Sequence, residues 1–249
     1  MKILSLIPAR MGSTRFPGKP MALIGGKPMI GRVYEQVAQT QRLTSVYVAT
    51  CDEIIFDYIK SIGGNAVMTS NTHERASDRC AEALLLLEAQ HNYKYDIVVM
   101  VQGDEPLINP EMIDEAIRPL LKDPTVLVSN LYSDIISQDE ISDKNCIKVV
   151  CDLSMNAIYF SREAIPTIGK ALIFNHKKQV CVIPFRRDFL LEYSKLSPTP
   201  LEISESVDML RVLEHGFKVK MVKTMHLSQA VDTMEDLLKV ESIILSLQS

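Results

Sequence analysis

The chain has 249 residues, of which 47% are hydrophobic and 23% are charged, a balance typical of a soluble globular protein. This length suffices for a full hydrophobic core, and α/β chains of this size commonly form one domain, so a single domain over residues 1–249 is predicted. The formal net charge of -4 argues against a broad electrostatic hold on nucleic acid, so no nucleic-acid partner is expected. Any anionic ligand must bind to a local cluster of basic groups.

Cysteine usage and hydropathy indicate the compartment. The 5 cysteines are odd in number, and no pair has the C-x-x-C spacing of zinc or redox motifs, which favours a reducing environment. No stretch approaches the roughly 20 apolar residues that a membrane span needs, so no membrane insertion is expected. The apolar run at residues 3–7 is too short for a signal peptide and is soon followed by Arg10. These features predict a cytoplasmic protein.

Short runs rich in Val and Ile alternate with segments of helical period along the first half of the chain. Strands are predicted at residues 2–7, 45–51, 66–68, 97–101 and 125–130, and helices at 29–39, 52–62, 76–89 and 109–121. The run IVVMV at 97–101 is the most apolar, which suits the middle of a parallel sheet covered on both faces. This alternation predicts an α/β fold with an open, doubly wound, mostly parallel Rossmann-like sheet, which binds ligands at the carboxyl ends of its strands.

The second half of the chain has a less regular pattern. Strands are predicted at 146–151, 157–160, 179–185 and near 219–223, and helices at 202–214 and 233–247. The region from about 155 to 200 is expected to form a smaller antiparallel extension of the main sheet.

A basic, glycine-containing loop, IPARMGSTRFPGKP at residues 7–20, follows the first predicted strand. Its functional candidates are Arg10, Gly12, Ser13, Arg15, Gly18 and Lys19. Glycines let the backbone approach a ligand, and three cations at one strand end can neutralise a triphosphate. A solvated basic loop is the alternative. Lys19 precedes Pro20 rather than Ser or Thr, so this is no Walker P-loop, and the absence of G-x-G-x-x-G disfavours a Rossmann dehydrogenase.

Asp104 and Glu105 follow the most apolar strand, where an α/β sheet presents its functional groups. Mg²⁺ favours hard oxygen ligands and is often held by one or two carboxylates together with substrate phosphates. Asp104 is therefore the first candidate ligand. The alternative is that Asp104 only shapes the turn before Pro106.

The loop at 7–20 and the QGDEP segment resemble the signatures of the CMP-KDO synthetases (3-deoxy-manno-octulosonate cytidylyltransferases), within the wider nucleotide-sugar cytidylyltransferase family. The resemblance covers essentially the whole chain, and these two segments are its most specific parts. Further matches are VMTS (67–70), VQGDEPLI (101–108), KVV (148–150), IYFSREAIP (158–166), SPTPLE (197–202), LRVLEHG (210–216) and VDTMEDL (231–237).

The resemblance implies a Mg²⁺-dependent transfer of CMP from CTP to an acidic sugar, with release of pyrophosphate, as a step of lipopolysaccharide biosynthesis. It implies that Lys19, Asp104 and Asp232 are catalytic and that Asp104 and Asp232 hold the metal ion. The alternative for Asp232 is helix capping together with Glu235, since Asp is a favoured N-cap and Glu three residues later is its usual companion. A homodimer formed through the extension at about 155–200 is also expected from the resemblance.

Six residues are assigned to nucleotide binding, and Gln102 among them is expected to contact the cytosine base or the ribose. The six are Arg10, Ser13, Arg15, Lys19, Arg79 and Gln102. The (S/G)TER-like segment of the family is replaced here by HERASDRCAE, in which Arg79 keeps the guanidinium. His73, in the same stretch, is expected to face solvent.

The sequence departs from the family where the acidic sugar binds. The family's H-x-G-x-Y-x-Y strand is replaced by QVCVIPF, which places Gln179, Cys181, Ile183 and Phe185 at the four named positions. Predicted acceptor-binding residues are Gln179, Asp208 and Met209, the last two where the family often has Glu and Gln. These exchanges remove polar partners, and pockets built on hydrogen bonds discriminate strongly.

Three hypotheses therefore stand side by side. The acceptor is KDO or a close analogue, or it is a different acidic acceptor, or the chain is a regulatory nucleotide-binding protein without turnover. The role of Arg162 in the YFSR segment is also open between phosphate binding and pairing with a carboxylate.

Overall fold

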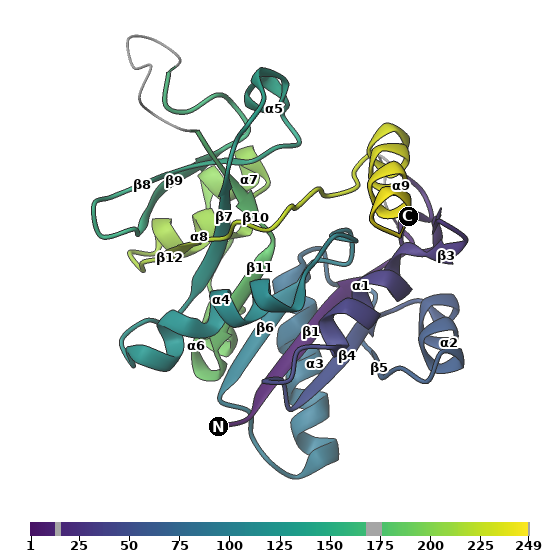
Figure 1. Cartoon of the computed structure of the whole chain (residues 1–249). Coiled ribbons are helices and arrows are strands. Elements are labelled where there is room, and N and C mark those ends of the chain that lie inside the picture. The colour runs from purple at the N-terminus through teal and green to yellow at the C-terminus, as the bar shows by residue number, and fades with distance from the viewer. Residues whose placement is uncertain (13–15, 168–175, 249) are drawn as a thin grey trace. The chain divides into compact units, whose positions relative to one another are not determined.

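The computed structural model describes residues 1–12, 16–167 and 176–248, and Figure 1 shows the course of the chain. The chain forms two compact units. Unit 1 comprises Met1–Asp114 and Leu227–Ser249, and unit 2 comprises Glu115–His226. The helix α4 (Pro110–Lys122) runs across the point where the chain passes from one unit to the other. The prediction of one domain over residues 1–249 stays a prediction.

Unit 1 is built on parallel strands, as the apolar runs predict. In spatial order these strands are β6 (Ile97–Val101), β1 (Ile3–Ala9), β4 (Ser45–Thr50) and β5 (Ala66–Met68). Leu6 of β1 lies opposite Tyr47 on one side and Met100 on the other. Every residue of β1 and β6 is buried, which explains why these strands have continuous apolar sequences rather than alternating ones.

Helices pack on the strands of unit 1, and the C-terminal helix returns to it. They are α1 (Met29–Ala38), α2 (Glu53–Ser61), α3 (Ala76–His91) and α9 (Met234–Gln248), with the short elements η1 (Lys19–Met21), β2 (Leu23–Ile24) and β3 (Lys27–Pro28). One core cluster joins α9 to the segment around β2. Its members are Ile24, Met29, Val231, Leu237, Val240 and Ile244. This cluster brings the end of the chain back to its beginning.

Unit 2 contains a second, mainly antiparallel sheet. Its strands in spatial order are β12 (Lys220–Lys223), β7 (Ser129–Asp134), β10 (Lys177–Val180), β8 (Lys148–Cys151) and β9 (Ala157–Ser161). Only the β12–β7 pair among these is parallel. The other elements of unit 2 are β11 (Val182–Arg186), α5 (Gln138–Ser142), α6 (Arg187–Tyr193), α7 (Pro200–Glu205) and α8 (Asp208–Glu214). The mixed α/β fold with a mostly parallel sheet and an antiparallel sheet is confirmed.

Two predicted strands of unit 2 have the wrong limits. The strand predicted at 125–130 begins only at Ser129. The reason is an Asx turn, in which the carboxylate of Asp123 accepts hydrogen bonds from the backbone N and Oγ1 of Thr125 at 2.8 and 2.7 Å. The strand predicted at 179–185 is divided at Cys181 into β10 and β11.

The helix predicted at 202–214 is two helices, because Ser206 adopts a left-handed conformation with φ of 53°. Strand β9 holds this break. The Glu205 carboxylate accepts hydrogen bonds from Ser161 Oγ and the backbone N of Arg162, both at 2.8 Å. Arg162 donates from Nε to the Glu205 carbonyl at 2.6 Å and from Nη1 to the Lys144 carbonyl at 2.8 Å. In this structure its guanidinium therefore binds backbone carbonyls.

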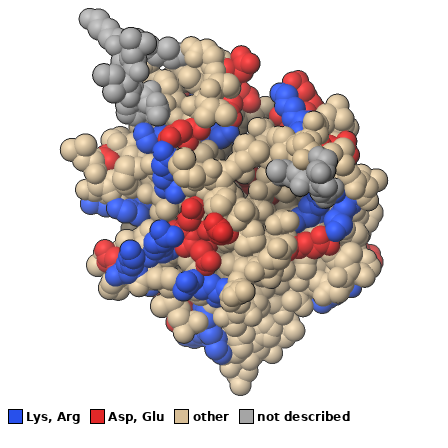
Figure 2. All heavy atoms as spheres, viewed as in Figure 1, with Lys and Arg blue, Asp and Glu red and all other residues tan. Residues whose placement is uncertain are grey.

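Surface features agree with the composition. Within the described ranges, no helix is both long and apolar enough to cross a membrane. All five cysteines are free thiols. On the face drawn in Figure 2, Lys and Arg side chains are interspersed with Asp and Glu side chains.

Candidate active site

The loop after β6 carries Asp104 and passes very close to the end of β1. Gly103 permits this approach, since a Cβ atom there would lie 3.1 Å from the carbonyl oxygen of Pro8 and 3.2 Å from Ile30 Cδ1. Such distances are shorter than ordinary carbon contacts, so a side chain there would require its neighbours to shift by a few tenths of an ångström. The glycine of QGDEP therefore fixes Asp104 at the carboxyl edge of the parallel sheet, as predicted from the sequence.

Lys19 lies at the start of η1, directly after Gly18, whose φ of 72° is left-handed and suits glycine. Its ammonium Nζ donates to Asp104 Oδ2 at 2.6 Å, to the Val231 carbonyl at 2.9 Å and to Asp232 Oδ1 at 3.2 Å. The three donors of the ammonium thus have three acceptors. Three segments far apart in the sequence meet at this one nitrogen.

The three charged side chains are largely shielded from solvent, with exposed fractions of 13% for Lys19, 27% for Asp104 and 17% for Asp232. Burial by itself lowers the pKa of Lys19, but the two neighbouring carboxylates outweigh it and raise that pKa above its ordinary value. The ammonium is therefore charged at neutral pH and compensates part of the negative charge of the pair.

The segment before α9 is tied to the loop after β6 by two hydrogen bonds. The backbone N of Val231 donates to the Asp104 carbonyl at 2.9 Å. Ser228 Oγ donates to Glu105 Oε2 at 3.0 Å, and both of these residues are buried. Because Val231 precedes Asp232, these bonds place the Asp232 carboxylate beside Asp104. Neither tie was predicted from the sequence, where a buried Glu and a Ser 123 residues apart carry no local signal.

The helix cap of α9 is made one residue later than the sequence alternative supposed. Thr233 Oγ1 accepts from the backbone N of Asp236 at 3.2 Å, and the Asp236 carboxylate accepts from the backbone N of Thr233 at 2.9 Å. This reciprocal pair is a capping box. Asp232 therefore does not cap α9 with Glu235, and its carboxylate is directed to Lys19 instead. The overlapping pattern Thr233–Asp236 was the available signal for this cap.

The donor set at Lys19 suits Mg²⁺ in its chemistry. Asp104 and Asp232 present carboxylate oxygens to one common cation, and such hard ligands are those Mg²⁺ prefers. Within residues 1–12, 16–167 and 176–248, no group of three His, Cys, Asp or Glu residues that could hold a metal ion is found. A pair of carboxylates completed by substrate phosphates matches the way proteins commonly bind Mg²⁺. The residues present fit the predicted ion, and its assignment stays a prediction.

The remaining part of the predicted nucleotide site lies around the end of β1. Arg10 is exposed directly after this strand, and its Nη1 reaches the His73 carbonyl at 3.4 Å. The next residue, Met11, donates its backbone N to Asp52 Oδ2 at 2.8 Å, so Asp52 at the end of β4 anchors the loop. Ser13 and Arg15 lie outside the described residues. Gln102 is half-buried directly after β6, near Asp104 in the sequence.

Arg79 is buried in α3, with 3% exposure, and ties down the loop after β5. Its Nη1 donates to Thr69 Oγ1 at 2.5 Å and to the Ser70 carbonyl at 3.2 Å. Its role in nucleotide binding stays a prediction. His73 does not simply face solvent, because its Nε2 lies 2.5 Å from Glu82 Oε2. The Glu82 carboxylate also accepts from the backbone N of Ser70 at 2.9 Å, so Glu82 links His73 to Ser70.

The predicted acceptor residues lie in unit 2 and have local partners there. On β10, Gln179 donates its amide Nε2 to Asn130 Oδ1 at 2.5 Å. Asp208 begins α8, and its backbone carbonyl accepts from Tyr193 Oη at 3.0 Å. Met209 is completely buried. Their contact with a sugar stays a prediction.

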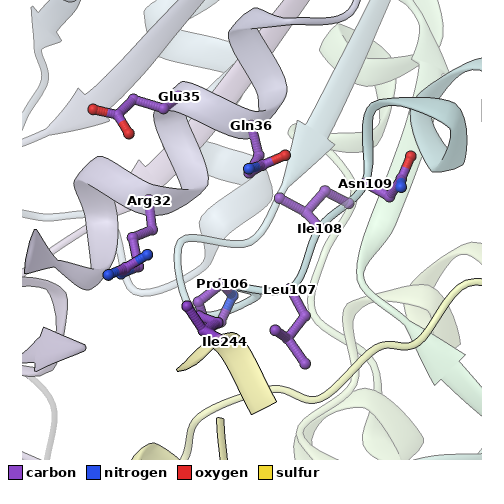
Figure 3. Close-up of a pocket in the computed structure, with 8 residues that line it drawn as sticks. All are labelled: Arg32, Glu35, Gln36, Pro106, Leu107, Ile108, Asn109 and Ile244. Carbon is purple, nitrogen blue, oxygen red and sulfur yellow. The ribbon is translucent and has the colours of Figure 1, made fainter. Parts of the chain in front are cut away.

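A separate pocket of about 310 Å³ lies in unit 1 between α1, the loop after Glu105 and α9 (Figure 3). Its lining combines the apolar side chains of Pro106, Leu107, Ile108 and Ile244 with the polar ones of Arg32, Glu35, Gln36 and Asn109. Arg32 is already engaged, since its Nε donates to the Ile24 carbonyl at 2.6 Å. Among the described residues, none of the predicted site residues lines this pocket.

A parallel sheet whose carboxyl edge holds a largely shielded lysine between two carboxylates is the arrangement of an α/β protein that binds a phosphate-bearing ligand at that edge. Comparison with known families agrees and is more specific. The family described as cytidylyltransferase matches residues 4–225, and this chain belongs to that family.

Several relatives are similar over almost the full chain. A 3-deoxy-manno-octulosonate cytidylyltransferase from Geobacter metallireducens is 44% identical, with 96% of each chain covered. The protein of the same name from Pelobacter propionicus is 44% identical over 100% of both chains, and that from Fusobacterium nucleatum is 41% identical over 98% of this chain and 97% of its own.

Solved structures are also similar. A CMP:2-keto-3-deoxy-manno-octonic acid synthetase in complex with CTP has a TM-score of 0.87 at 36% identity, with 99% of both chains covered. The 4-diphosphocytidyl-2C-methyl-D-erythritol synthase of Anaerococcus prevotii has a TM-score of 0.65 at 14% identity, covering 98% of this chain and 96% of its own. This second likeness concerns the fold alone.

Proposed function

We propose that this chain is the cytidylyltransferase that couples CMP from CTP to a 3-deoxy-2-ulosonic acid, KDO or a close analogue, and releases pyrophosphate with Mg²⁺ as cofactor. One observation carries the proposal: Lys19 holds Asp104 and Asp232 together at 2.6 and 3.2 Å on the carboxyl edge of the parallel sheet. The names of the relatives that are 41–44% identical support KDO as the acceptor, and the CTP complex of the structural relative supports the donor. Such a product would serve lipopolysaccharide biosynthesis.

The proposed reaction is an in-line displacement at the α-phosphorus of CTP. The anomeric hydroxyl oxygen of the acid forms a bond to that phosphorus and loses its proton to solvent. The bond from the α-phosphorus to the oxygen bridging to the β-phosphorus breaks, and pyrophosphate departs with that electron pair. When held by Asp104 and Asp232, Mg²⁺ would supply Lewis-acid stabilisation of negative charge on the phosphates and would make the attacking hydroxyl more acidic.

The residues of the chain contribute position and charge rather than a covalent intermediate. Asp104 and Asp232 would hold the metal ion, and Lys19 and Arg10 would neutralise the triphosphate and the departing pyrophosphate. Gly103 and the tie between Glu105 and Ser228 keep this edge in place. Ser13, Arg15, Arg79 and Gln102 are proposed to complete the nucleotide site.

A second candidate, a different acidic acceptor, is favoured by the replaced strand in unit 2. Two of the positions where the family has Tyr are filled here by core residues. Ile183 has 2% exposure, and Phe185 is fully buried, with its ring centroid 6.4 Å from Phe189 and 5.9 Å from Tyr193. Neither side chain offers a hydrogen bond to a sugar hydroxyl. The set of acceptor contacts is therefore proposed to differ from that of the family, which favours an analogue with fewer or different polar groups.

A homodimer and a cytoplasmic location belong to the same proposal. Apolar side chains on unit 2 support the dimer, since Leu153 is fully exposed and Ile158 is 60% exposed. A contiguous patch of exposed apolar side chains commonly marks an interface, and we propose that these two residues belong to such a patch in the dimer. Sedimentation at two protein concentrations would test the dimer.

The function is tested by pyrophosphate release from CTP and Mg²⁺ with a panel of 2-keto-3-deoxy acids that includes KDO. We expect turnover with at least one of these acids and little turnover when UTP replaces CTP. Turnover with another acid but not with KDO would select the second candidate. CTP binding without pyrophosphate release from any acid would contradict the proposal and favour a regulatory protein.

A further inference from the structure

Lys19 and the metal ion require the same two carboxylates. The ammonium takes a position between Asp104 Oδ2 at 2.6 Å and Asp232 Oδ1 at 3.2 Å, and it also binds the Val231 carbonyl at 2.9 Å. A divalent ion bound by both carboxylates cannot share this position with the ammonium, because the two cations repel each other. Lys19 therefore acts as the counter-ion of the pair in the protein without ligands.

We propose that Lys19 competes with the divalent ion for Asp104 and Asp232, and that CTP relieves this competition by drawing the ammonium to its phosphates. The empty protein then binds the metal ion weakly, and metal and nucleotide bind cooperatively. This inference rests on the proposed function for the identity of the metal ligands. Beyond the proposed function, it makes the Lys19 ammonium an internal cation whose competition leaves metal binding dependent on the nucleotide.

The competition is strong because the ammonium is largely shielded from solvent where it meets the carboxylates. The Lys19 side chain is only 13% exposed. If the ammonium moved away from its three acceptors and gained no others, its positive charge would be poorly solvated. The backbone N of Val231 donates to the Asp104 carbonyl, and this hydrogen bond holds Val231 in place. The Val231 carbonyl therefore does not move with the ammonium when the ammonium is displaced. When a metal ion binds without nucleotide, its binding free energy is therefore weakened by the full free energy of displacing the ammonium.

A triphosphate removes this cost. Lysine is a flexible, compact cation that binds phosphate well, so phosphate oxygens replace all three acceptors of the ammonium. The basic loop that contains Lys19 begins beside Arg10, which is exposed at the end of β1 and adds to the attraction for the triphosphate. Linkage requires the effect to be reciprocal, so the metal ion strengthens nucleotide binding by the same factor.

The test measures Mn²⁺ binding without nucleotide, from the electron paramagnetic resonance signal of free Mn²⁺, which accepts the same carboxylate ligands. Lys19→Met removes the internal cation, and Lys27→Met is the matched control. Lys27 is also a lysine of unit 1 paired with a carboxylate, Glu35 at 2.6 Å, but it lies outside the site. We expect Lys19→Met to bind Mn²⁺ at least about tenfold more tightly than the wild type, a typical size for coupling between sites. Lys27→Met should match the wild type.

Two further variants keep the result unambiguous. Adding Asp104→Asn to Lys19→Met should abolish the gain, which would locate the ion at this pair. Lys19→Gln retains a hydrogen-bond donor without the charge, and it replaces Lys19→Met if thermal melts show that the methionine variant is unfolded. Equal Mn²⁺ affinity in the wild type and a folded, neutral Lys19 variant would overturn the proposal. Since no acceptor or turnover is involved, failure of the proposed reaction with every acid would leave this measurement readable.

Discussion

The two units treat their predicted functional side chains in different ways. In unit 1, charged residues from three distant segments converge, and Lys19 binds Asp104 and Asp232 at 2.6 and 3.2 Å. In unit 2, the predicted acceptor residues are engaged locally. Gln179 bonds to Asn130 at 2.5 Å, and Met209 is completely buried. In unit 1 the charged groups pair with one another at the edge of the parallel sheet, whereas in unit 2 the predicted residues contact their own sheet or are buried in its core.

The difference follows from the kind of ligand proposed for each unit. A triphosphate and its metal ion demand fixed charges, so few residue types can serve in unit 1. An acceptor is selected through hydrogen bonds and shape, which many combinations of side chains can provide. We therefore expect substitutions in unit 1 to abolish the reaction and substitutions at the acceptor strand to change its selectivity.

The largest effect is expected from Asp104→Asn. The amide keeps the shape of the side chain but removes the charge that binds Lys19 and would bind the metal ion. The kcat/KM for CTP should fall by about 10²- to 10³-fold, the range found for losing one preorganised electrostatic group. Pyrophosphate release measures it. Asp114→Asn, at a partly exposed carboxylate of unit 1 that binds Arg42 at 3.1 Å, is the control and should retain full activity. Activity above a tenth of the wild type would contradict the assigned role of Asp104.

A smaller loss is expected from Glu105→Gln, which weakens the bond to Ser228 and so loosens the segment that delivers Asp232. Residues that orient metal ligands typically contribute about 10- to 100-fold in activity or metal affinity. The Mg²⁺ concentration for half-maximal rate should rise, and saturating Mg²⁺ should recover part of the rate. Ser228→Ala should show the same shift from the other side of the bond. An unchanged Mg²⁺ requirement in both variants would show that the tie does not position Asp232.

In unit 2, Gln179→His restores the residue type that the family has at this position. A ring N–H can still donate to Asn130, and the second ring nitrogen offers a new partner to the acid. The KM for KDO should fall by about fivefold, the equivalent of one net hydrogen bond, while the KM for CTP stays unchanged. Steady-state rates at varied KDO measure this, with Gln138→His in the exposed helix α5 as the control. A change in the KM for CTP with no change in the KM for KDO would show that Gln179 does not contact the acceptor.

The smallest effects come from matched helix caps, one in each unit. Thr233→Ala removes the cap of α9, and Ser137→Ala removes that of α5, where Ser137 Oγ accepts from the backbone N of Glu140 at 3.2 Å. Each should lower the free energy of unfolding by about 1 kcal/mol, measured in urea. Only Thr233→Ala should also raise the Mg²⁺ requirement, because Thr233 follows Asp232 directly. Equal Mg²⁺ requirements in the two variants would show that the cap of α9 does not help to position Asp232.

Part of this architecture could be read from local sequence. The IVVMV run gave the limits of β6 correctly, because a buried parallel strand has a continuous apolar sequence. The position of Asp104 at the carboxyl edge of the sheet was predicted because this residue comes shortly after that strand. The limits of β7, the division at Cys181 and the break at Ser206 could not be read in the same way. Each depends on a turn or on a contact with another strand, such as that of Glu205 with Ser161, whereas hydrophobic periodicity continues through them.

The sequence by itself determined the fold class and the family, because strand hydrophobicity and the motif of the basic loop are local properties of the chain. Only the tertiary structure decided that Thr233 rather than Asp232 caps α9. The segment VDTMED contains two overlapping capping patterns of similar local energy. In the folded chain the Asp232 carboxylate binds the ammonium of Lys19, which is distant in sequence but adjacent in space. Contacts of this kind arise only once the chain has folded.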